Sequence, residues 1–265
     1  MDGRLGRWAL ALWSLGVVLF LWLPLGIILV YAFNASNIQS WPIPGFTTRW
    51  FSVAWHDPDA RSALELSLKA ALSATAIALV LGTMAAVAIS RFRFFGRETF
   101  SFLLVLPIAL PGVITGIALS SFYTFWSVNF SLWTIVVGHA TFCVVIVYNN
   151  VLARLRRTSP SLIEASQDLG ADGWQTFRYV TFPALSTALI SGALLAFALS
   201  FDEVIVTTFT AGAQNTLPIW ILGKIRLGQQ LPEVNAVVFF VIVLTAVPVA
   251  VAQRLTQESG LLRRE

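Results

Sequence analysis

Two adjacent carboxylates, Asp202 and Glu203, lie within a long apolar run and are the residues there best suited to binding chemistry. An ionisable group in an apolar segment is costly, so it usually faces a cavity or a partner. Neighbouring residues on a helix point about 100° apart, so at most one of the two faces a given pathway centrally. A carboxylate at this position would attract a cationic solute, and aromatic faces would add cation–π contacts. Aromatic residues expected at a similar depth are Phe201, Phe209, Tyr123 and Trp126.

The polar residues in these runs also allow structural explanations. Glu65 and Lys69 lie four residues apart and can form an ion pair with each other. Lys69 could instead pair with Asp202 or Glu203, so structural pairing or gating stands beside substrate contact as an explanation. His139 is a lone histidine in an apolar run, where packing is a more frequent role than ligand binding.

The sequence lacks the motifs of an enzyme. It contains no HExxH zinc motif, no nucleophile elbow and no P-loop. Its single cysteine, Cys143, excludes an intrachain disulfide and a cysteine-based metal site. We therefore expect no catalytic residue, no metal site and no cofactor in this chain, and any step driven by ATP must be powered by another protein.

A second informative spacing lies in residues 161–183. Ser161 and Glu164 have the spacing of a capping box, which starts a helix. Gly170 can adopt the left-handed conformation that ends one. Asp172, followed three residues later by a glutamine, marks a second helix start. The pattern predicts two short helices with a glycine corner, and their apolar and aromatic side chains indicate a surface for a partner protein.

The composition places these residues in a membrane protein. The chain is 57% hydrophobic and only 11% charged, whereas a soluble domain is about one quarter charged. A membrane-spanning helix takes roughly 20 residues. We expect one all-α transmembrane domain over residues 1–265, with a cytoplasmic loop at 154–183 and spans near 8–33, 63–90, 100–126, 132–151, 184–210 and 234–252. A kink and a close-packing surface in the third span are predicted from Pro107, Pro111, Gly112 and Gly116.

The basic residues fix the expected orientation. Cytoplasmic segments of membrane proteins are enriched in Lys and Arg. With both termini in the cytoplasm, most of the 17 basic residues fall on that side: Arg4, Arg7, Arg91, Arg93, Arg97, Arg154, Arg156, Arg157, Arg178, Arg254, Arg263 and Arg264. The net charge of +4 is therefore explained by topology, and we expect no nucleic-acid partner.

The loop also resembles a known family motif. It has the order Glu164-Ala165-Ser166, three residues, Gly170, nine residues, Val180, one residue, Phe182-Pro183. This is similar to the EAA loop of ABC importer permeases, with mild departures at Ser166, Val180 and Phe182. Three further segments resemble the second permease subunit of spermidine/putrescine-type importers: Leu106–Gly112, Ser200–Val204 and Pro232–Ala236.

This resemblance implies a fold, partners and a coupling surface. The fold would be the six-span, type I (MetI-like) importer permease fold in the bacterial inner membrane, surrounded by lipid. The partners would be a homologous second permease, an ATPase dimer that carries ATP and Mg, and a periplasmic substrate-binding protein. The residues implied to contact the ATPase are Glu164, Ala165, Ser166, Leu169, Gly170, Ala171, Phe177 and Pro183.

The cargo is the least determined feature of the sequence. The resemblance favours polyamines such as putrescine and spermidine, or a related small cation. The alternatives are another small solute, such as 4-aminobutyrate or an amino-acid derivative, and an ATP-independent secondary transporter. Secondary transporters often carry an internal repeat, and none is evident here.

Overall fold

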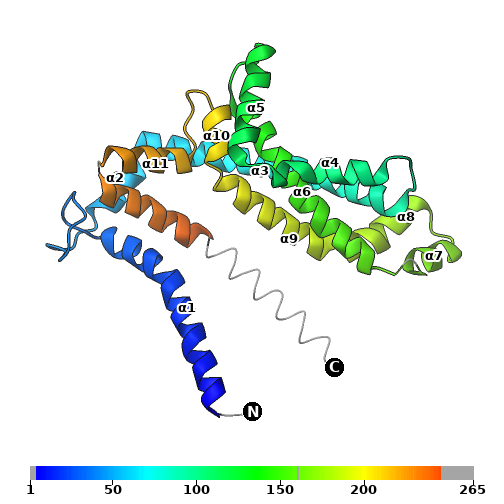
Figure 1. Cartoon of the computed structure of the whole chain (residues 1–265), viewed down its shortest axis with the longest axis horizontal. Helices are drawn as coiled ribbons and strands as arrows, with labels where there is room; N and C mark the ends of the chain where they lie inside the picture. Colours follow the sequence, from blue (N-terminus) through cyan, green and yellow to red (C-terminus); the bar gives the residue numbers. More distant parts are fainter. Residues whose placement is uncertain (1–3, 160, 229, 246–265) are drawn as a thin grey trace. The chain divides into compact units, whose positions relative to one another are not determined.

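The chain folds into helices throughout the part that the structure describes. A computed structural model describes residues 4–159, 161–228 and 230–245, and within them the only strand-like pairing is an isolated bridge between Asn34 and Phe46. The chain divides into two compact units, Ser62–Trp220 and the combination of Met1–Arg61 with Ile221–Glu265. The helices, labelled in Figure 1, are α1 (Arg4–Tyr31), α2 (Arg49–His56), α3 (Pro58–Arg91), α4 (Arg97–Ala109), α5 (Gly112–Phe125), α6 (Leu132–Arg157), α7 (Ser161–Asp168), α8 (Gly173–Thr176), a π-helical turn (Phe177–Thr181), α9 (Phe182–Phe201), α10 (Ile205–Thr210), α11 (Leu217–Leu227) and an unlabelled last helix (Leu231–Thr245).

Four described helices are long and apolar enough to cross a membrane. They occupy Gly6–Tyr31, Pro58–Arg91, Leu132–Arg157 and Gly173–Phe201. A fifth span is formed if α4 and α5 act together, although they are bent by 103° with respect to each other. The apolar helix Leu231–Thr245 covers the first part of the expected sixth span, and residues 246–252 of that span lie outside the described residues.

Helix α6 forms the centre of the Ser62–Trp220 unit. Small residues of α3, among them Ala70, Ala74 and Ala78, pack in the same apolar core as Val147 of α6. Gly82 of α3 lies so close to α6 that an added Cβ would be 2.8 Å from the carbonyl oxygen of Val144. Most of α6 is buried, and it packs closely against α9 and α10, as Figure 1 shows.

Two of the expected spans are divided into separate helices. In the third, α4 ends before Pro111, and Leu110 is extended with ψ 141°, as steric contact with a following proline favours. The glycine surface expected there is close-packed, since a Cβ on Gly116 would lie 2.5 Å from Cδ2 of Phe209. In the fifth, the helix stops at Phe201 and restarts at Ile205.

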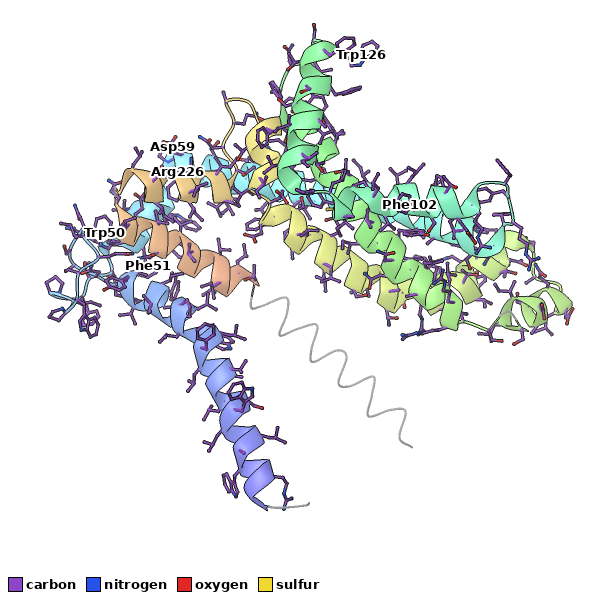
Figure 2. All side chains as sticks on the ribbon, in the orientation of Figure 1. Trp50, Phe51, Asp59, Phe102, Trp126 and Arg226 are labelled. Atoms are coloured by element: carbon purple, nitrogen blue, oxygen red, sulfur yellow. The ribbon has the colours of Figure 1, made fainter. Side chains whose placement is uncertain are left out.

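The other unit has an aromatic core near α2. The ring of Phe51 lies 4.9 Å from that of Phe33 and 5.2 Å from that of Phe239. Trp50, labelled with Phe51 in Figure 2, is buried and donates its indole N–H to the carbonyl oxygen of Asn34 at 2.7 Å. The guanidinium of Arg49 lies 4.4 Å from the Trp50 ring centroid, so cation–π attraction adds to this packing.

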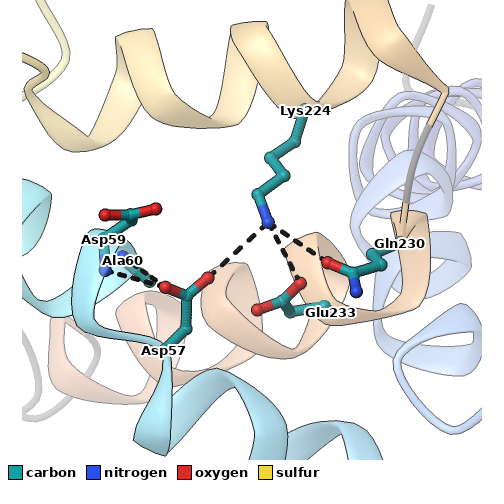
Figure 3. Close-up of polar contacts among 6 residues, drawn as sticks. All are labelled: Asp57, Asp59, Ala60, Lys224, Gln230 and Glu233. Atoms are coloured by element: carbon teal, nitrogen blue, oxygen red, sulfur yellow. Dashed lines mark hydrogen bonds and ion pairs between the residues drawn. The ribbon is translucent and has the colours of Figure 1, made fainter.

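A partly buried ion cluster joins α11 to the start of α3 and to the last helix (Figure 3). The ammonium of Lys224 lies 3.6 Å from Oδ2 of Asp57 and 3.4 Å from Oε2 of Glu233. Asp57 also caps α3, since its Oδ1 accepts the backbone N–H of Asp59 at 2.7 Å. Burial alone would raise the pKa of Asp57, but its interactions with Glu233, two backbone amides and Lys224 outweigh burial, so the pKa lies below the ordinary value. Asp57 is therefore held as an anion at neutral pH.

Candidate coupling surface and translocation path

The loop that follows α6 contains the glycine corner that the sequence predicts. Gly170 has φ +85°, a conformation that glycine adopts without steric cost. Around it, Ala171 N–H donates to the Ser166 carbonyl oxygen at 3.0 Å and Gly170 N–H donates to that of Gln167 at 2.8 Å. These two bonds define a Schellman motif, and the glycine corner is confirmed.

The second helix start is also confirmed, whereas the first capping box is wrong. Asp172 Oδ1 accepts the backbone N–H of Gln175 at 2.8 Å, and the Gln175 side chain accepts the N–H of Asp172 at 3.0 Å. Ser161, however, is itself the first residue of α7. Its hydroxyl lies 2.6 Å from that of Ser159, so Ser161 is not positioned to cap with Glu164.

The loop is held as a defined body beside the spans. The Ser166 and Thr176 hydroxyls lie 3.0 Å apart and join α7 to α8. Arg91, at the end of α3, donates to the Thr181 hydroxyl at 3.1 Å. Arg154 of α6 donates to the Ala184 carbonyl oxygen at 2.8 Å. The Ser166–Thr176 bond lies within the loop, the Arg91 bond ties the loop to the end of α3, and the Arg154 bond ties the end of α6 to the start of α9.

The outer surface of the loop is apolar and exposed. Leu169 is 89% exposed, Tyr179 75% and Trp174 69%. Large apolar side chains that are exposed together usually mark a site of interaction with a protein or a membrane. The aromatic rings of Trp174 and Phe177 lie 5.7 Å apart. Among the predicted coupling residues, those exposed are Glu164, Ala165, Leu169, Gly170, Phe177 and Pro183, and those half-buried are Ser166 and Ala171. The arrangement fits a surface that a partner protein covers.

The two predicted path carboxylates have different surroundings. Glu203 is half-buried, and its Oε1 accepts the backbone N–H of Val206 at 2.9 Å, which caps α10. Asp202 is exposed at the break between α9 and α10, and no described side chain pairs with its carboxylate. Lys69 pairs with Glu65 at 2.6 Å, so the alternative pairing of Lys69 with the two path carboxylates is absent from this structure.

The predicted aromatic residues do not gather into one cage in this chain. Phe201 stacks on Phe197 with centroids 5.8 Å apart, and Phe209 packs against Gly116. Tyr123 is buried and donates its hydroxyl to the Thr134 carbonyl oxygen at 3.2 Å. Trp126, labelled at the end of α5 in Figure 2, is 64% exposed. Their role in a substrate path stays a prediction.

The structure adds a residue that sequence reasoning assigned only to packing. His139 of α6 is buried, and both of its ring nitrogens contact hydroxyls of neighbouring helices. Nδ1 lies 2.7 Å from Ser200 Oγ of α9, and Nε2 lies 2.8 Å from Thr207 Oγ1 of α10. The sequence shows His139, Ser200 and Thr207 as polar residues in otherwise apolar runs. That they lie at the same depth depends on how α6 packs against α9, which the sequence does not reveal.

The comparison with known families decides what this arrangement belongs to. Residues 78–257 match the family described as binding-protein-dependent transport system inner membrane component. The chain belongs to this family. The matched residues contain the candidate coupling loop and the α9–α10 break, and the family is one of transport permease subunits. Together with the apolar helices, this makes the chain a multi-pass membrane protein.

Two relatives of this binding-protein-dependent permease carry transport names. The chain is 37% identical over 238 residues to the putrescine transport system permease protein PotI of Escherichia coli K12, covering 86% of this chain and 83% of PotI. It is 30% identical over 260 residues to the spermidine/putrescine transport system permease protein PotC of the same strain, covering 97% of this chain and 96% of PotC.

A solved structure supports the fold of this permease. The chain matches the crystal structure of a bacterial ABC transporter involved in the import of the acidic polysaccharide alginate with a TM-score of 0.71 and 16% identity. The match covers 96% of this chain and 98% of that chain. The MetI-like ABC permease fold is therefore confirmed, whereas the six spans and the cytoplasmic termini stay predictions.

Proposed function

We propose that this permease forms half of the pathway through which an ABC importer brings putrescine, spermidine or a related small polyamine into the cell. The observation that carries the proposal is the 37% identity to a putrescine permease over 86% of the chain. A similar match to a spermidine/putrescine permease supports the same cargo class.

The chemistry at the α9–α10 break is compatible with a cationic cargo. Asp202 offers an exposed carboxylate at a point where the helix is interrupted. A polyamine carries protonated amines, which carboxylates attract strongly where the dielectric constant is low. Glu203 is engaged in capping α10, so we assign substrate contact to Asp202 and a supporting role to Glu203.

The proposed assembly follows from the family. Six spans with both termini in the cytoplasm would place the exposed surface of α7 and α8 in the cytoplasm of a bacterium, against an ATPase subunit. A homologous second permease would complete the pathway, and a periplasmic binding protein would deliver the cargo. ATP and Mg would reside on the ATPase, so this chain would need no cofactor of its own.

Competition for uptake tests the cargo. Cells that express the complete complex would be given radiolabelled putrescine with a tenfold excess of unlabelled putrescine, spermidine, 4-aminobutyrate or sulfate. We expect spermidine and unlabelled putrescine to suppress uptake and the other two solutes to leave it unchanged. Suppression by 4-aminobutyrate alone would transfer the assignment to amino-acid derivatives, and suppression by sulfate would exclude a cation path.

A further inference from the structure

The interruption between α9 and α10 lacks the residues that usually break a helix. Residues 200–205 contain neither proline nor glycine, and both sides of the break have apolar sequence. A helix that stops in an apolar run leaves backbone groups without partners, which is costly there. Glu203 Oε1 satisfies one of these groups, the Val206 N–H, and the neighbouring helix adds further stabilisation.

His139 supplies that stabilisation from the neighbouring helix. Its ring lies between Ser200, in the last turn of α9, and Thr207, in the first turns of α10. The two hydroxyl contacts, 2.7 Å and 2.8 Å long, lie on opposite sides of the break. One imidazole thus connects both halves of the interrupted span to α6.

The hydrogen bonds fix how the ring is protonated. The Thr207 hydroxyl donates its one hydrogen to the Glu203 carbonyl oxygen at 2.6 Å, so its oxygen accepts from His139. Nε2 therefore carries a hydrogen, and in the neutral ring Nδ1 accepts from the Ser200 hydroxyl. The result is a directed chain of three bonds that runs from Ser200 through His139 and Thr207 to the backbone of Glu203, the residue beside Asp202.

Helix α6 holds the two halves at further points. The Thr134 hydroxyl lies 2.8 Å from the Thr210 carbonyl oxygen at the end of α10. Gly138 allows close approach, since a Cβ there would lie 3.1 Å from Cγ1 of Val206. On the α9 side, Cys143 donates its thiol to the Ala196 carbonyl oxygen at 3.4 Å. Only His139 contacts both halves among these described residues.

We propose that His139 is a positioning residue that holds the α9–α10 break open and thereby presents the Asp202 carboxylate to a cationic substrate. His139 does not contact the substrate in this account, because it is buried behind the two hydroxyls. The link to substrate rests on the proposed function, whereas the effect of His139 on the break does not. The two can be tested separately.

The test combines transport kinetics with the reactivity of a thiol at the break. His139→Leu removes both bonds at similar volume, and His139→Gln keeps a donor and an acceptor. In the complete complex, we expect His139→Leu to raise the putrescine concentration for half-maximal uptake at least about fivefold, as loss of roughly one net hydrogen bond implies. His139→Gln should lie nearer to the wild type. Thr207→Val, which loses only the bridging hydroxyl, should resemble His139→Leu and serves if that variant fails to accumulate.

The thiol measurement uses Asp202→Cys in a Cys143→Ala background, because Cys143 is the only native cysteine. We expect His139→Leu to change the labelling rate at position 202 by a charged methanethiosulfonate at least about threefold. Cys143→Ala by itself is the matched control, since it removes a bond between α6 and the unbroken part of α9, and it should leave the half-saturation concentration unchanged.

Two results would overturn the role of His139. One is an unchanged labelling rate at position 202 in both His139→Leu and Thr207→Val. The other is a loss confined to protein amount or maximal rate, with labelling as in the wild type, which would make His139 a packing residue only. If labelling changes but Asp202→Asn transports normally, the positioning of the break stands and the substrate role of Asp202 fails.

Discussion

Replacing Gly170 with aspartate should reduce putrescine uptake by at least about thirtyfold, the effect of losing roughly 2 kcal/mol at the centre of an interface. Gly170 has φ +85° at the corner between α7 and α8, and a non-glycine residue there strains the backbone. An added Cβ would meet no atom within 4 Å in this chain. The new carboxylate would therefore project from the corner toward the surface that we assign to the ATPase.

The measurement is uptake together with co-purification of the ATPase on the tagged permease. Gly96→Asp is the control, because Gly96 also has a positive φ, +79°, and open space around its Cβ, but it lies at the start of α4, outside the coupling loop. We expect Gly170→Asp to reach the membrane in normal amount without retaining the ATPase. Gly96→Asp should retain both the ATPase and putrescine uptake. Equal uptake by wild type and Gly170→Asp would remove the docking role from this corner.

Asp202→Asn should raise the putrescine concentration needed for half-maximal uptake by about tenfold, equivalent to roughly 1.4 kcal/mol of binding free energy. The substitution keeps the size of the side chain and removes the charge, which is the property that a cationic amine recognises. Because no described side chain pairs with Asp202, the change should leave the packing of α9 and α10 intact. The measurement is the concentration dependence of initial uptake rates in the complete complex.

The neighbouring carboxylate provides the control for this prediction. Glu203 Oε1 accepts the Val206 N–H, and the amide oxygen of glutamine can accept the same bond. Glu203→Gln should therefore change the half-saturation concentration by less than about twofold. If Asp202→Asn showed wild-type kinetics, or if the two variants had equal effects, Asp202 would not be the residue that contacts the cation.

The features predictable from the sequence are those whose causes lie within a few residues. Gly170 ends α7, and Asp172 with Gln175 starts α8, because capping chemistry is local. The kink near Pro111 is predictable for the same reason, since proline constrains the residue before it. The 103° size of the bend is not, because it depends on how α5 packs against α10.

The α9–α10 break has a cause that is distant in sequence. Ser200 and Thr207 reach His139 across 61 and 68 residues, and neither proline nor glycine marks the site. A continuous helix over residues 184–210 was thus the reasonable expectation from periodicity alone. The capping box predicted at Ser161 was wrong for a local reason, since Ser161 is the first residue of α7 and not the residue before it. For the candidate path, the sequence predicted the carboxylates, and the bond between Glu203 and the Val206 N–H separates its role from that of Asp202.

Reconstituted transport tests the central claim, that this permease imports a polyamine under power from a separate ATPase. Proteoliposomes would contain the complete complex, with the binding protein and labelled putrescine outside and ATP on the side of the ATPase. We predict uptake that requires ATP and binding protein, stops with vanadate, and is absent when this chain is reconstituted alone. Putrescine uptake by the chain alone, without ATP, would contradict it and identify a secondary transporter.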